Sequence, residues 1–268
     1  MLIPERITAE RHPGTGPIAI EVVDETGSTN ADLMQRIDEL HIPTLRVALA
    51  QTAGRGRNGR AWHSEPGASL TFSLAWPFSR SLLAMAGLPL AVGVAIADVL
   101  GKFGVKVHLK WPNDVMKNGK KLAGVLIEMG PSRGRTPGRW AIIGVGLNLT
   151  LPDSLEDRIE QPAADAPWLA RMDRNSLMAA LLDGLSDAAA LFDREGFAPF
   201  MRRWNELHLH AGQEVTIIDR GQNLRNGVAA GIDDSGHLLL DTGAGRFTIS
   251  AGDVSLRALN EYEHAVID

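Results

Sequence analysis

The sequence contains no cysteine, and it lacks the features of several large protein classes. The absence of cysteine excludes disulfides, thiol nucleophiles and thiolate metal sites. Lys and Arg number 27 against 32 Asp and Glu, which gives a net charge of −5. This balance argues against broad contact with nucleic acid, although it leaves room for a local basic pocket. Residues 1–6 lack the basic and apolar regions of a signal peptide, so we expect a cytoplasmic protein.

Long uncharged runs and known catalytic signatures are also scarce. Residues 81–97 carry no charge, but a membrane span needs about 20 residues, and this stretch contains Pro89. We therefore predict a buried core helix over residues 82–103 and no membrane contact. The eight histidines show no spacing typical of a metal site, and no Gly-x-Ser-x-Gly motif supports a serine hydrolase.

The most informative feature present is the segment from Gln51 to Trp62. Its residues 54–60 contain three glycines and three arginines. Glycine allows the backbone N–H groups to approach a ligand closely, and arginine offers a planar, permanently charged fork to carboxylate or phosphate. Because the segment follows an apolar strand-like run, it predicts a clamp for a small anionic ligand. A basic, solvated hairpin loop is the alternative.

The same segment satisfies the dinucleotide-binding pattern through Gly54, Gly56 and Gly59. That interpretation requires a helix that opens at the third glycine and an acidic residue about 20 positions later. Pro66 and Gly67 interrupt any such helix, and residues 76–81 contain no carboxylate. A protein-kinase loop also fails, because no His-Arg-Asp or Asp-Phe-Gly follows.

Hydrophobic patterning predicts a chain in which strands and helices alternate, preceded by a loose arm at residues 1–17. The predicted strands lie at 18–23, 47–51, 69–76 (half-buried), 107–111, 115–128 (a hairpin turning at Asn118-Gly119) and 140–149. The predicted helices lie at 31–40, 82–103, 174–195 and 197–210. From residue 213 onward, five short strands at 215–219, 228–232, 237–241, 246–250 and 254–259 fit a small β-barrel. We place domains at 1–210 and 211–268.

Two polar clusters occur near the centre of the chain. Asn113 and Asp114 would present oxygen ligands at a strand end, which suits hydrated Mg²⁺ or ribose and phosphate, although a plain β-turn explains them equally. Lys120 and Lys121 are adjacent on a strand and must point to opposite faces, so only one can face a pocket. Gly124 leaves room for a ligand against that strand, and two exposed lysines flanking a turn are the alternative.

Two further clusters carry amide or hydroxyl groups. Gly144 and Gly146 within a strand mark a close approach by a ligand or another backbone. Asn148 among apolar neighbours could recognise a heterocycle such as adenine, or serve a structural role. Thr29 and Asp32 match a capping box, which would leave Ser28 and Asn30 free to meet a ligand.

Taken together and in this order, these clusters resemble the bacterial biotin–protein ligase family. The matching segments span about residues 20 to 150 and lie at 27–30, 51–62, 110–114, 121–128 and 144–148. The resemblance implies an α/β (α+β) fold, with a class II synthetase-like mixed sheet, flanking helices and a small C-terminal SH3-like β-barrel. Some relatives carry an N-terminal DNA-binding module. Because about 20 residues precede the first expected strand, we expect no DNA binding.

The resemblance also implies a reaction in two steps. The biotin carboxylate attacks the α-phosphate of ATP, with Mg²⁺, and gives biotinyl-5′-AMP and pyrophosphate. A specific lysine of a biotin carboxyl carrier protein then attacks the mixed anhydride. The alternatives are a lipoate–protein ligase or octanoyltransferase of the same superfamily, or a non-enzymatic binder that keeps the adenylate. Both a monomer and a homodimer remain open.

Site residues are carried over from the resemblance by position in this sequence. Lys121 and Arg57 are the expected catalytic residues, and Asn113 lies on the expected metal side. The expected biotin-binding residues are Ser28, Thr29, Asn30, Gln51, Gly54, Arg55, Gly56, Arg57, Lys121 and Gly124. The expected nucleotide-binding residues are Arg55, Arg57, Arg60, Trp62, Asn113, Lys121 and Asn148. A loop over adenine is implied near residues 152–168, where Trp168 could stack.

Overall fold

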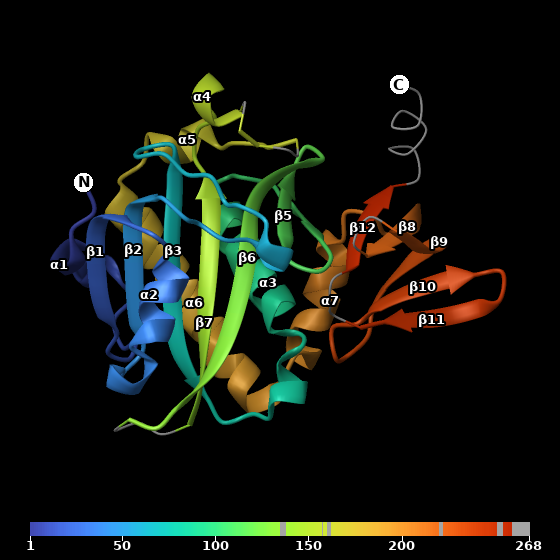
Figure 1. Cartoon of the computed structure of the whole chain (residues 1–268), viewed down its shortest axis with the longest axis horizontal. Coiled ribbons are helices and arrows are strands. Elements are labelled where there is room, and N and C mark those ends of the chain that lie inside the picture. Colours follow the sequence, from blue (N-terminus) through green and yellow to red (C-terminus); the bar gives the residue numbers. More distant parts are fainter. Residues whose placement is uncertain (135–137, 157, 160–161, 220–221, 251–253, 259–268) are drawn as a thin grey trace.

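The computed structural model describes residues 1–134, 138–156, 158–159, 162–219, 222–250 and 254–258, arranged around two sheets (Figure 1). The larger sheet has the strand order β1-β2-β3-β7-β6-β5-β4. Strands β1 and β2 are parallel and the other neighbours are antiparallel, which confirms the predicted mixed sheet. Its strands are β1 (Ala19–Thr26), β2 (Thr44–Gln51), β3 (Ser69–Phe78), β4 (His108–Lys110), β5 (Asp114–Lys117), β6 (Lys120–Ser132) and β7 (Gly138–Asn148).

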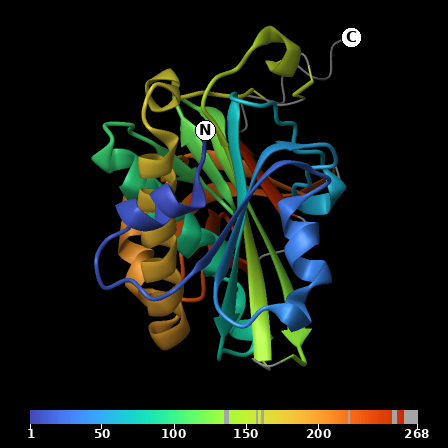
Figure 2. The ribbon, with the colours of Figure 1, turned by 90° about the vertical axis from the view of Figure 1, so that its left-hand side faces the viewer.

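Helices cover both faces of this sheet (Figure 2). One face carries α2 (Thr29–Gln35) and the short 3₁₀ turn η1 (Ile37–Glu39), which pack on a small cluster that includes Leu33, Trp140 and Ile142. The opposite face carries the main hydrophobic core. Its helices are α1 (Pro4–Glu10), α3 (Leu88–Lys102), α6 (Arg174–Glu195) and α7 (Ala198–Leu207).

The predicted core helix is present, but it begins with a separate 3₁₀ turn, η3 (Leu82–Met85). The segment Leu82–Lys102 is long and apolar enough to cross a membrane, with a mean hydropathy of 2.1 in its most apolar stretch, yet 67% of that stretch is buried within the fold. Its apolar character is explained by packing against the sheet and α6. An added Cβ at Gly184 of α6 would lie 2.7 Å from a methyl group of Val99, so these helices approach closely.

The strand β3 differs from the prediction of a half-buried strand, because both of its faces are buried. Thr71 and Ser73 are 1% and 0% exposed. Leu70, Phe72 and Leu74 face the main core, as their alternation predicts. The polar face lies beneath α2 instead of facing water, and two of its hydroxyls are satisfied internally, by bonds from Thr71 Oγ1 to the Ala48 carbonyl and from Ser73 Oγ to Asn30 Oδ1.

The N-terminal segment also differs from the prediction, since residues 4–10 form α1 instead of a loose arm. Leu2 and Ile7 are buried against the core. The Arg11 Nε atom donates to Asp183 of α6 at 2.8 Å, and the Ile3 N–H donates to Asn175 at 2.8 Å. Two apolar side chains and these polar contacts are enough to fix a segment whose overall composition is polar.

The predicted hairpin turn and the C-terminal strands are confirmed. Asn118 and Gly119 both have positive φ, 51° and 77°, as the tight turn between β5 and β6 requires. The second, antiparallel sheet has the order β11-β10-β9-β8-β12, in keeping with an SH3-like domain. Residue 259 of the last predicted strand lies outside the described residues. The strands are β8 (Glu214–Asp219), β9 (Gln222–Ile232), β10 (Leu238–Thr242), β11 (Gly245–Ile249) and β12 (Val254–Ala258).

Candidate active site

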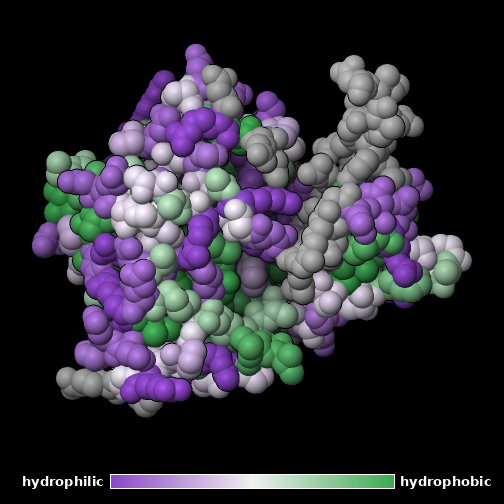
Figure 3. Space-filling model, in the orientation of Figure 1, coloured by the Kyte–Doolittle hydropathy of each residue, from purple (hydrophilic) through white to green (hydrophobic). Residues whose placement is uncertain are grey.

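A cavity of about 390 Å³ lies on the α2 face of the large sheet. Its volume falls in the range of ordinary small-molecule sites, about 300–1,000 Å³. Figure 3 shows that much of the molecular face in this view is covered by hydrophilic residues. The predicted site residues that line the cavity are Ser28, Thr29, Asn30, Gln51, Arg55, Gly56, Arg57, Arg60, Trp62, Asn113, Lys121, Gly124 and Asn148. Gly54 is the predicted residue that does not line it.

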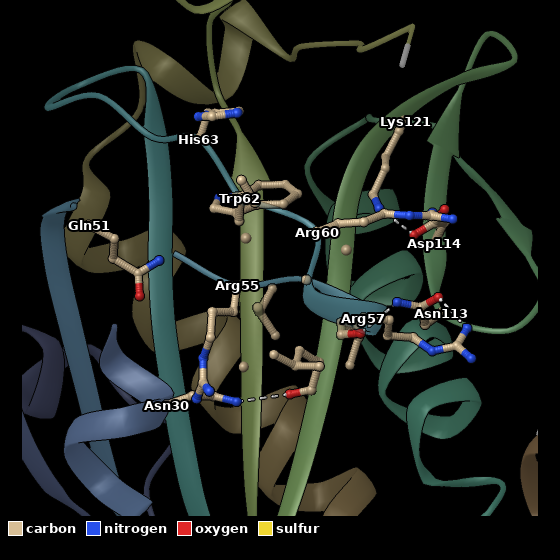
Figure 4. Close-up of a pocket in the computed structure, with 18 of the residues that line it drawn as sticks. Asn30, Gln51, Arg55, Arg57, Arg60, Trp62, His63, Asn113, Asp114 and Lys121 are labelled. Atoms are coloured by element: carbon tan, nitrogen blue, oxygen red, sulfur yellow. Dashed lines mark hydrogen bonds and ion pairs between the residues drawn. The ribbon is translucent and has the colours of Figure 1, made fainter. Parts of the chain in front are cut away.

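Gly54 instead closes the arginine-rich segment on itself. The Trp62 N–H donates to the Gly54 carbonyl at 2.9 Å, and the Gly56 N–H donates to the Arg60 carbonyl at 2.7 Å. An added Cβ at Gly54 would lie 2.5 Å from the Trp62 carbonyl oxygen, so only glycine fits there. The segment, called the arginine loop below (residues 54–62), is therefore a hydrogen-bonded hairpin that crosses over strands β7 and β6 (Figure 4).

The three arginines of this loop point to different parts of the cavity (Figure 4). Arg55 donates from Nη2 to the carboxylate of Glu128, at 3.1 Å from each oxygen. Arg57 donates from Nη1 to Asn113 Oδ1 at 3.4 Å. Arg60 extends toward Asp114 (Figure 4). The guanidinium groups are thus distributed along the wall of one cavity, as a clamp for an anion requires.

Lys121 reaches the cavity from the start of β6, while its neighbour Lys120 is exposed. This outcome confirms that only one of the two lysines faces the pocket. The Lys121 Nζ atom lies 2.7 Å from Asp114 Oδ1, with the two side chains 25% and 17% exposed. The same ammonium lies 5.9 Å from the centre of the Trp62 ring. The cavity therefore holds a half-buried lysine whose charge is compensated by one carboxylate.

The glycines within the strands make room for side chains of the site itself. An added Cβ at Gly144 would overlap the Asn30 amide, and one at Gly146 would overlap the Trp62 indole. At Gly124 it would lie 3.0 Å from Cε of Lys121. The prediction of a close approach is right, but the approaching groups are these side chains instead of another backbone.

The start of α2 differs from the predicted capping box. The N-cap residue is Ser28, whose Oγ accepts from the Ala31 N–H at 3.5 Å, so the cap uses one lone pair of this hydroxyl and leaves its O–H donor available in the cavity. The N-cap lies one residue before the predicted Thr29, and α2 begins at residue 29 instead of residue 31. Thr29 donates its N–H to Gln51 Oε1 at 2.8 Å, and its hydroxyl lies 3.1 Å from the same oxygen. Asp32 turns away from the cap and accepts from Thr26 and Arg46.

Asn113 and Asn148 both line the cavity, and each donates a side-chain hydrogen bond to a backbone carbonyl. Asn113 Nδ2 donates to the Val125 carbonyl at 2.7 Å. Asn148, which is 3% exposed, donates from Nδ2 to the Ala164 carbonyl at 3.2 Å. The Nδ2 groups of both asparagines therefore serve a structural role, as the alternative for Asn148 predicted. Within the described part of the chain, no three His, Asp or Glu side chains are grouped so as to hold a metal ion.

The sequence analysis missed several residues around the cavity. Ser73 and Glu128 hydrogen-bond Asn30 from behind, at 2.5 and 2.9 Å. Arg158, which follows the short helix α4 (Asp153–Glu156), lies at the cavity wall and contacts His63 Nδ1 at 3.2 Å. Alternation along β3 put Ser73 on a polar face, and Glu128 ends the matching segment 121–128, but neither pattern assigned these residues to the site. Arg158 falls within the segment 152–168 without a motif of its own.

Residues 162–164, which precede α5 (Pro167–Ala170), run beside Lys121. The Lys121 N–H donates to the Pro162 carbonyl at 3.0 Å, and the Ala164 N–H donates to the Lys121 carbonyl at 2.8 Å. Trp168 lies on α5 with 63% of its surface exposed and is not among the lining residues of the cavity. The stacking role considered for Trp168 therefore stays a prediction.

A buried histidine pair lies behind the strand that leads into the site. His208 and His210 are 5% and 7% exposed, and the intervening Leu209 N–H donates to the Leu109 carbonyl of β4 at 2.9 Å. Burial lowers the pKa of each imidazole to about 4, with a smaller contribution from His210 at His208 and from Lys110 at His210. The two rings are therefore neutral at pH 7.

Comparison with known proteins decides the family. Residues 19–148 match the Biotin/lipoate A/B protein ligase family, and residues 210–257 match the Biotin protein ligase C terminal domain. The biotin--[acetyl-CoA-carboxylase] ligase of Mycobacterium tuberculosis is 34% identical over 253 residues, which cover 90% of each chain. The chain belongs to the biotin protein ligase family.

Two further family members agree with this assignment. The bifunctional ligase/repressor BirA of Escherichia coli is 35% identical over 247 residues, covering 90% of this chain and 74% of the relative. The crystal structure of the Aquifex aeolicus biotin protein ligase, in complex with biotin and ATP, superposes with a TM-score of 0.74 at 28% identity. That match covers 90% of this chain and 99% of the Aquifex chain.

Proposed function

We propose that this family member is an ATP-dependent biotin–protein ligase. It converts biotin and ATP to biotinyl-5′-AMP and pyrophosphate, and then transfers biotin to a lysine of a biotin carboxyl carrier protein. The observation that carries the proposal is the gathering of Arg55, Arg57, Arg60 and Lys121 around one cavity. The activity for which the Mycobacterium tuberculosis relative is named, and the Aquifex aeolicus structure with biotin and ATP, support the choice of substrates.

The first step brings two anions together. An oxygen of the biotin carboxylate attacks the α-phosphorus of ATP, and the bond to the β-phosphate oxygen breaks so that pyrophosphate leaves. Two groups of like charge approach each other only if fixed cations reduce their repulsion. We assign this role to Lys121 and Arg57, because both line the cavity and lie beside the neighbouring residues Asp114 and Asn113. The protein contributes mainly position and charge, as in other phosphoryl chemistry.

The proposed division of the cavity follows the character of its walls. Neutral polar groups gather at the α2 end, where Ser28, Thr29, Asn30 and Gln51 would bind the ring system of biotin, with Gly124 alongside and the loop residues Gly54 to Arg57 above. The nucleotide would lie along Arg55, Arg57, Arg60, Trp62, Lys121 and Asn148, with Asn113 on the metal side. The Lys110–Asp114 end supplies both a cation and a carboxylate.

Magnesium would enter as part of the ATP substrate. Mg²⁺ usually keeps several waters and is held by substrate phosphates with one or two protein oxygens. The residues present fit this mode. Asn113 Oδ1 accepts one long hydrogen bond, from Arg57 at 3.4 Å, and Asp114 is the one carboxylate among the described residues that line the cavity. The ion supplies further neutralisation of the phosphate charge when bound.

The second step requires an unprotonated amine. The acceptor lysine attacks the acyl carbon of the mixed anhydride, the acyl–phosphate bond breaks, and AMP leaves with the phosphate charge. We propose Asp114 as the group that accepts the proton of the incoming ammonium, because it is the carboxylate that faces the cavity in the described part of the lining. Its partner Lys121, 2.7 Å away, would then turn to the AMP phosphate.

The proposed function is tested by exchange of labelled pyrophosphate into ATP, run separately with biotin, lipoate and octanoate. We expect exchange with biotin alone. Exchange with lipoate would preserve the proposed adenylation chemistry but would identify the enzyme as a lipoate–protein ligase. A complete lack of exchange with all three acids would contradict the proposal and favour a protein that binds its ligand without activating it. The match of residues 210–257 favours biotin over lipoate.

A further inference from the structure

Glu128 of β6 joins the arginine loop to the neutral end of the cavity. One of its carboxylate oxygens accepts from Asn30 Nδ2 at 2.9 Å, and both oxygens lie 3.1 Å from Arg55 Nη2. Glu128 itself is not among the residues that line the cavity, whereas Asn30 and Arg55 are. It therefore acts on the cavity through these two neighbours.

The contacts of Asn30 extend this connection across the floor of the site. Asn30 Oδ1 accepts from Ser73 Oγ at 2.5 Å, and Ser73 Oγ lies 2.7 Å from the Thr29 hydroxyl. Because the Ser73 proton goes to Asn30, the Thr29 hydroxyl is the donor to Ser73, and the Thr29 N–H donates to Gln51 Oε1 at 2.8 Å. The chain of hydrogen bonds thus runs from Arg55 through Glu128, Asn30, Ser73 and Thr29 to Gln51.

The two ends of this chain are four residues apart in the sequence. Gln51 is the last residue of β2, and Arg55 is the second residue of the arginine loop that follows. The arginine loop and the floor of the cavity therefore form a closed ring. The backbone of residues 51–55 joins the two ends of the chain of hydrogen bonds. In such a ring, a change at the floor alters the position of the loop, and the reverse holds.

Glu128 differs from the neutral residues of the ring because its contact with Arg55 is an ion pair. The contacts between Asn30, Ser73, Thr29 and Gln51 join neutral groups, whereas the contact of Glu128 with Arg55 joins opposite charges and is stronger. Arg55 is 46% exposed and Glu128 is 29% exposed, so the pair is partly screened and reversible. A contact of this strength suits a latch that must open for a ligand to enter and leave.

We propose that Glu128 is a positioning residue that latches the arginine loop over the cavity through Arg55 while it orients the Asn30 amide. The latch itself does not rest on the proposed function, whereas its effect on the reaction intermediate does. With the latch closed, Arg55 lies over the neutral end of the site and the loop shields the activated acyl intermediate from water and from unrelated amines. With the latch open, the loop moves away and the intermediate is released early.

The first test uses the protein without substrates and does not depend on the proposed function. Trypsin cuts after arginine only where the chain can open, so cleavage after Arg57 and Arg60 measures how often the loop unlatches. We expect Glu128→Gln to speed this cleavage about three- to five-fold, because glutamine keeps an acceptor for Asn30 but loses the charge for Arg55. The control is Glu206→Gln on α7, which removes a partner of Arg203, an arginine as exposed as Arg55 (45% against 46%). Equal cleavage in Glu128→Gln and the parent would overturn the latch.

The second test asks whether Glu128 and Arg55 act through each other. In a double-mutant cycle with Glu128→Gln and Arg55→Gln, we expect the double variant to release biotinyl-adenylate no faster than either single variant. Additive effects would contradict the proposal. Glu128→Ala also removes the Asn30 acceptor, so we expect it to raise the KM for biotin beyond the value for Glu128→Gln. Equal KM values in the two variants would refute the second part of the proposal, the orientation of Asn30.

Discussion

The Nζ atom of Lys121 lies 2.7 Å from Oδ1 of Asp114, and the two side chains come from the facing strands β6 and β5. The ammonium has Asp114 as its ion-pair partner on one side and lies 5.9 Å from the centre of the Trp62 ring on the other. Such a group is fixed in position before any anion arrives, so little reorganisation accompanies the development of charge in the reaction. Lys121 is thus the cation whose removal gives the clearest test of the proposed chemistry.

Replacement of Lys121 by alanine should slow adenylation. We expect a loss of about 2–4 kcal/mol of transition-state stabilisation, which corresponds to about 30- to 1,000-fold in kcat/KM. The rate is measured as pyrophosphate release under biotin saturation. Lys120→Ala is the matched control, because Lys120 is adjacent but points away from the cavity. A Lys121→Ala rate within a few-fold of the parent would show that this lysine takes no part in the reaction.

Replacement of Arg57 by alanine should weaken retention of the adenylate. Without this guanidinium, the loop no longer neutralises the intermediate, and the activated acyl group escapes to bystander lysines. We expect more self-biotinylation, detected with labelled streptavidin after incubation with biotin and ATP. Arg202→Ala, at a position on α7 whose side chain is 90% exposed, serves as the control. Self-labelling at the parent's level would exclude Arg57 from this role.

Alanine at Gly146 should destabilise the protein as well as impair ligand binding. Its Cβ would overlap the Trp62 indole, and steric overlap in a packed site costs about 1–3 kcal/mol. Urea unfolding measures this change in the free energy of unfolding. Gly101→Ala is the opposite case, since Gly101 lies in α3 with no atom within 4 Å of the added Cβ. There we expect a gain of about 0.5–1 kcal/mol. An unchanged stability for Gly146→Ala would show that Trp62 moves freely.

Acid should destabilise the fold through His208 and His210. Their folded-state pKa of about 4 lies below the ordinary value of 6.5, so between these two pH values the unfolded chain binds more protons than the folded one. The stabilisation is fully present above pH 6.5 and is lost as the pH falls toward 4, at a rate of about 1.4 kcal/mol per pH unit for each ring.

The pH dependence is measured by urea unfolding at a series of pH values. His208→Phe keeps an aromatic ring against Trp204, whose centre lies 4.6 Å from that of His208, and removes one titrating group. We therefore expect a shallower decline of stability between pH 6.5 and 4. His12→Gln, at an exposed position, should leave the slope unchanged. Parallel curves for His208→Phe and the parent would contradict the assignment.

The sequence predicts most of the large sheet, because its strands carry strong local signals. The turn at Asn118 and Gly119 demands positive φ and is found where the pattern placed it. Helix α6 (Arg174–Glu195) matches the predicted range because its apolar spacing is regular and Gly196 ends it. The site residues were predicted from the resemblance to the ligase family, and all of them except Gly54 line one cavity in the structure.

What the sequence does not predict depends on contacts between distant segments. The segment around Ile7 is ordered by Asn175 and Asp183, more than 160 residues away. Ser73 is buried because α2 covers it, which alternation along β3 cannot reveal. Glu128 ends the matching segment 121–128, but its partner Arg55 lies 73 positions away, and no local pattern joins the two residues. The roles assigned to the individual site residues, and the domain boundary at 210/211, stay predictions.

The small sheet meets the large sheet beside the strand that enters the cavity. The Trp111 indole N–H donates to the carbonyl of Gly236, in the turn between β9 and β10, at 3.2 Å. On the other side of Lys110, the N–H of Leu209, which lies between α7 and β8, donates to the Leu109 carbonyl. The backbone that leads to Asn113 and Asp114 is therefore anchored from outside the large sheet, and the shape of the cavity depends on that anchorage as well as on the strands around it.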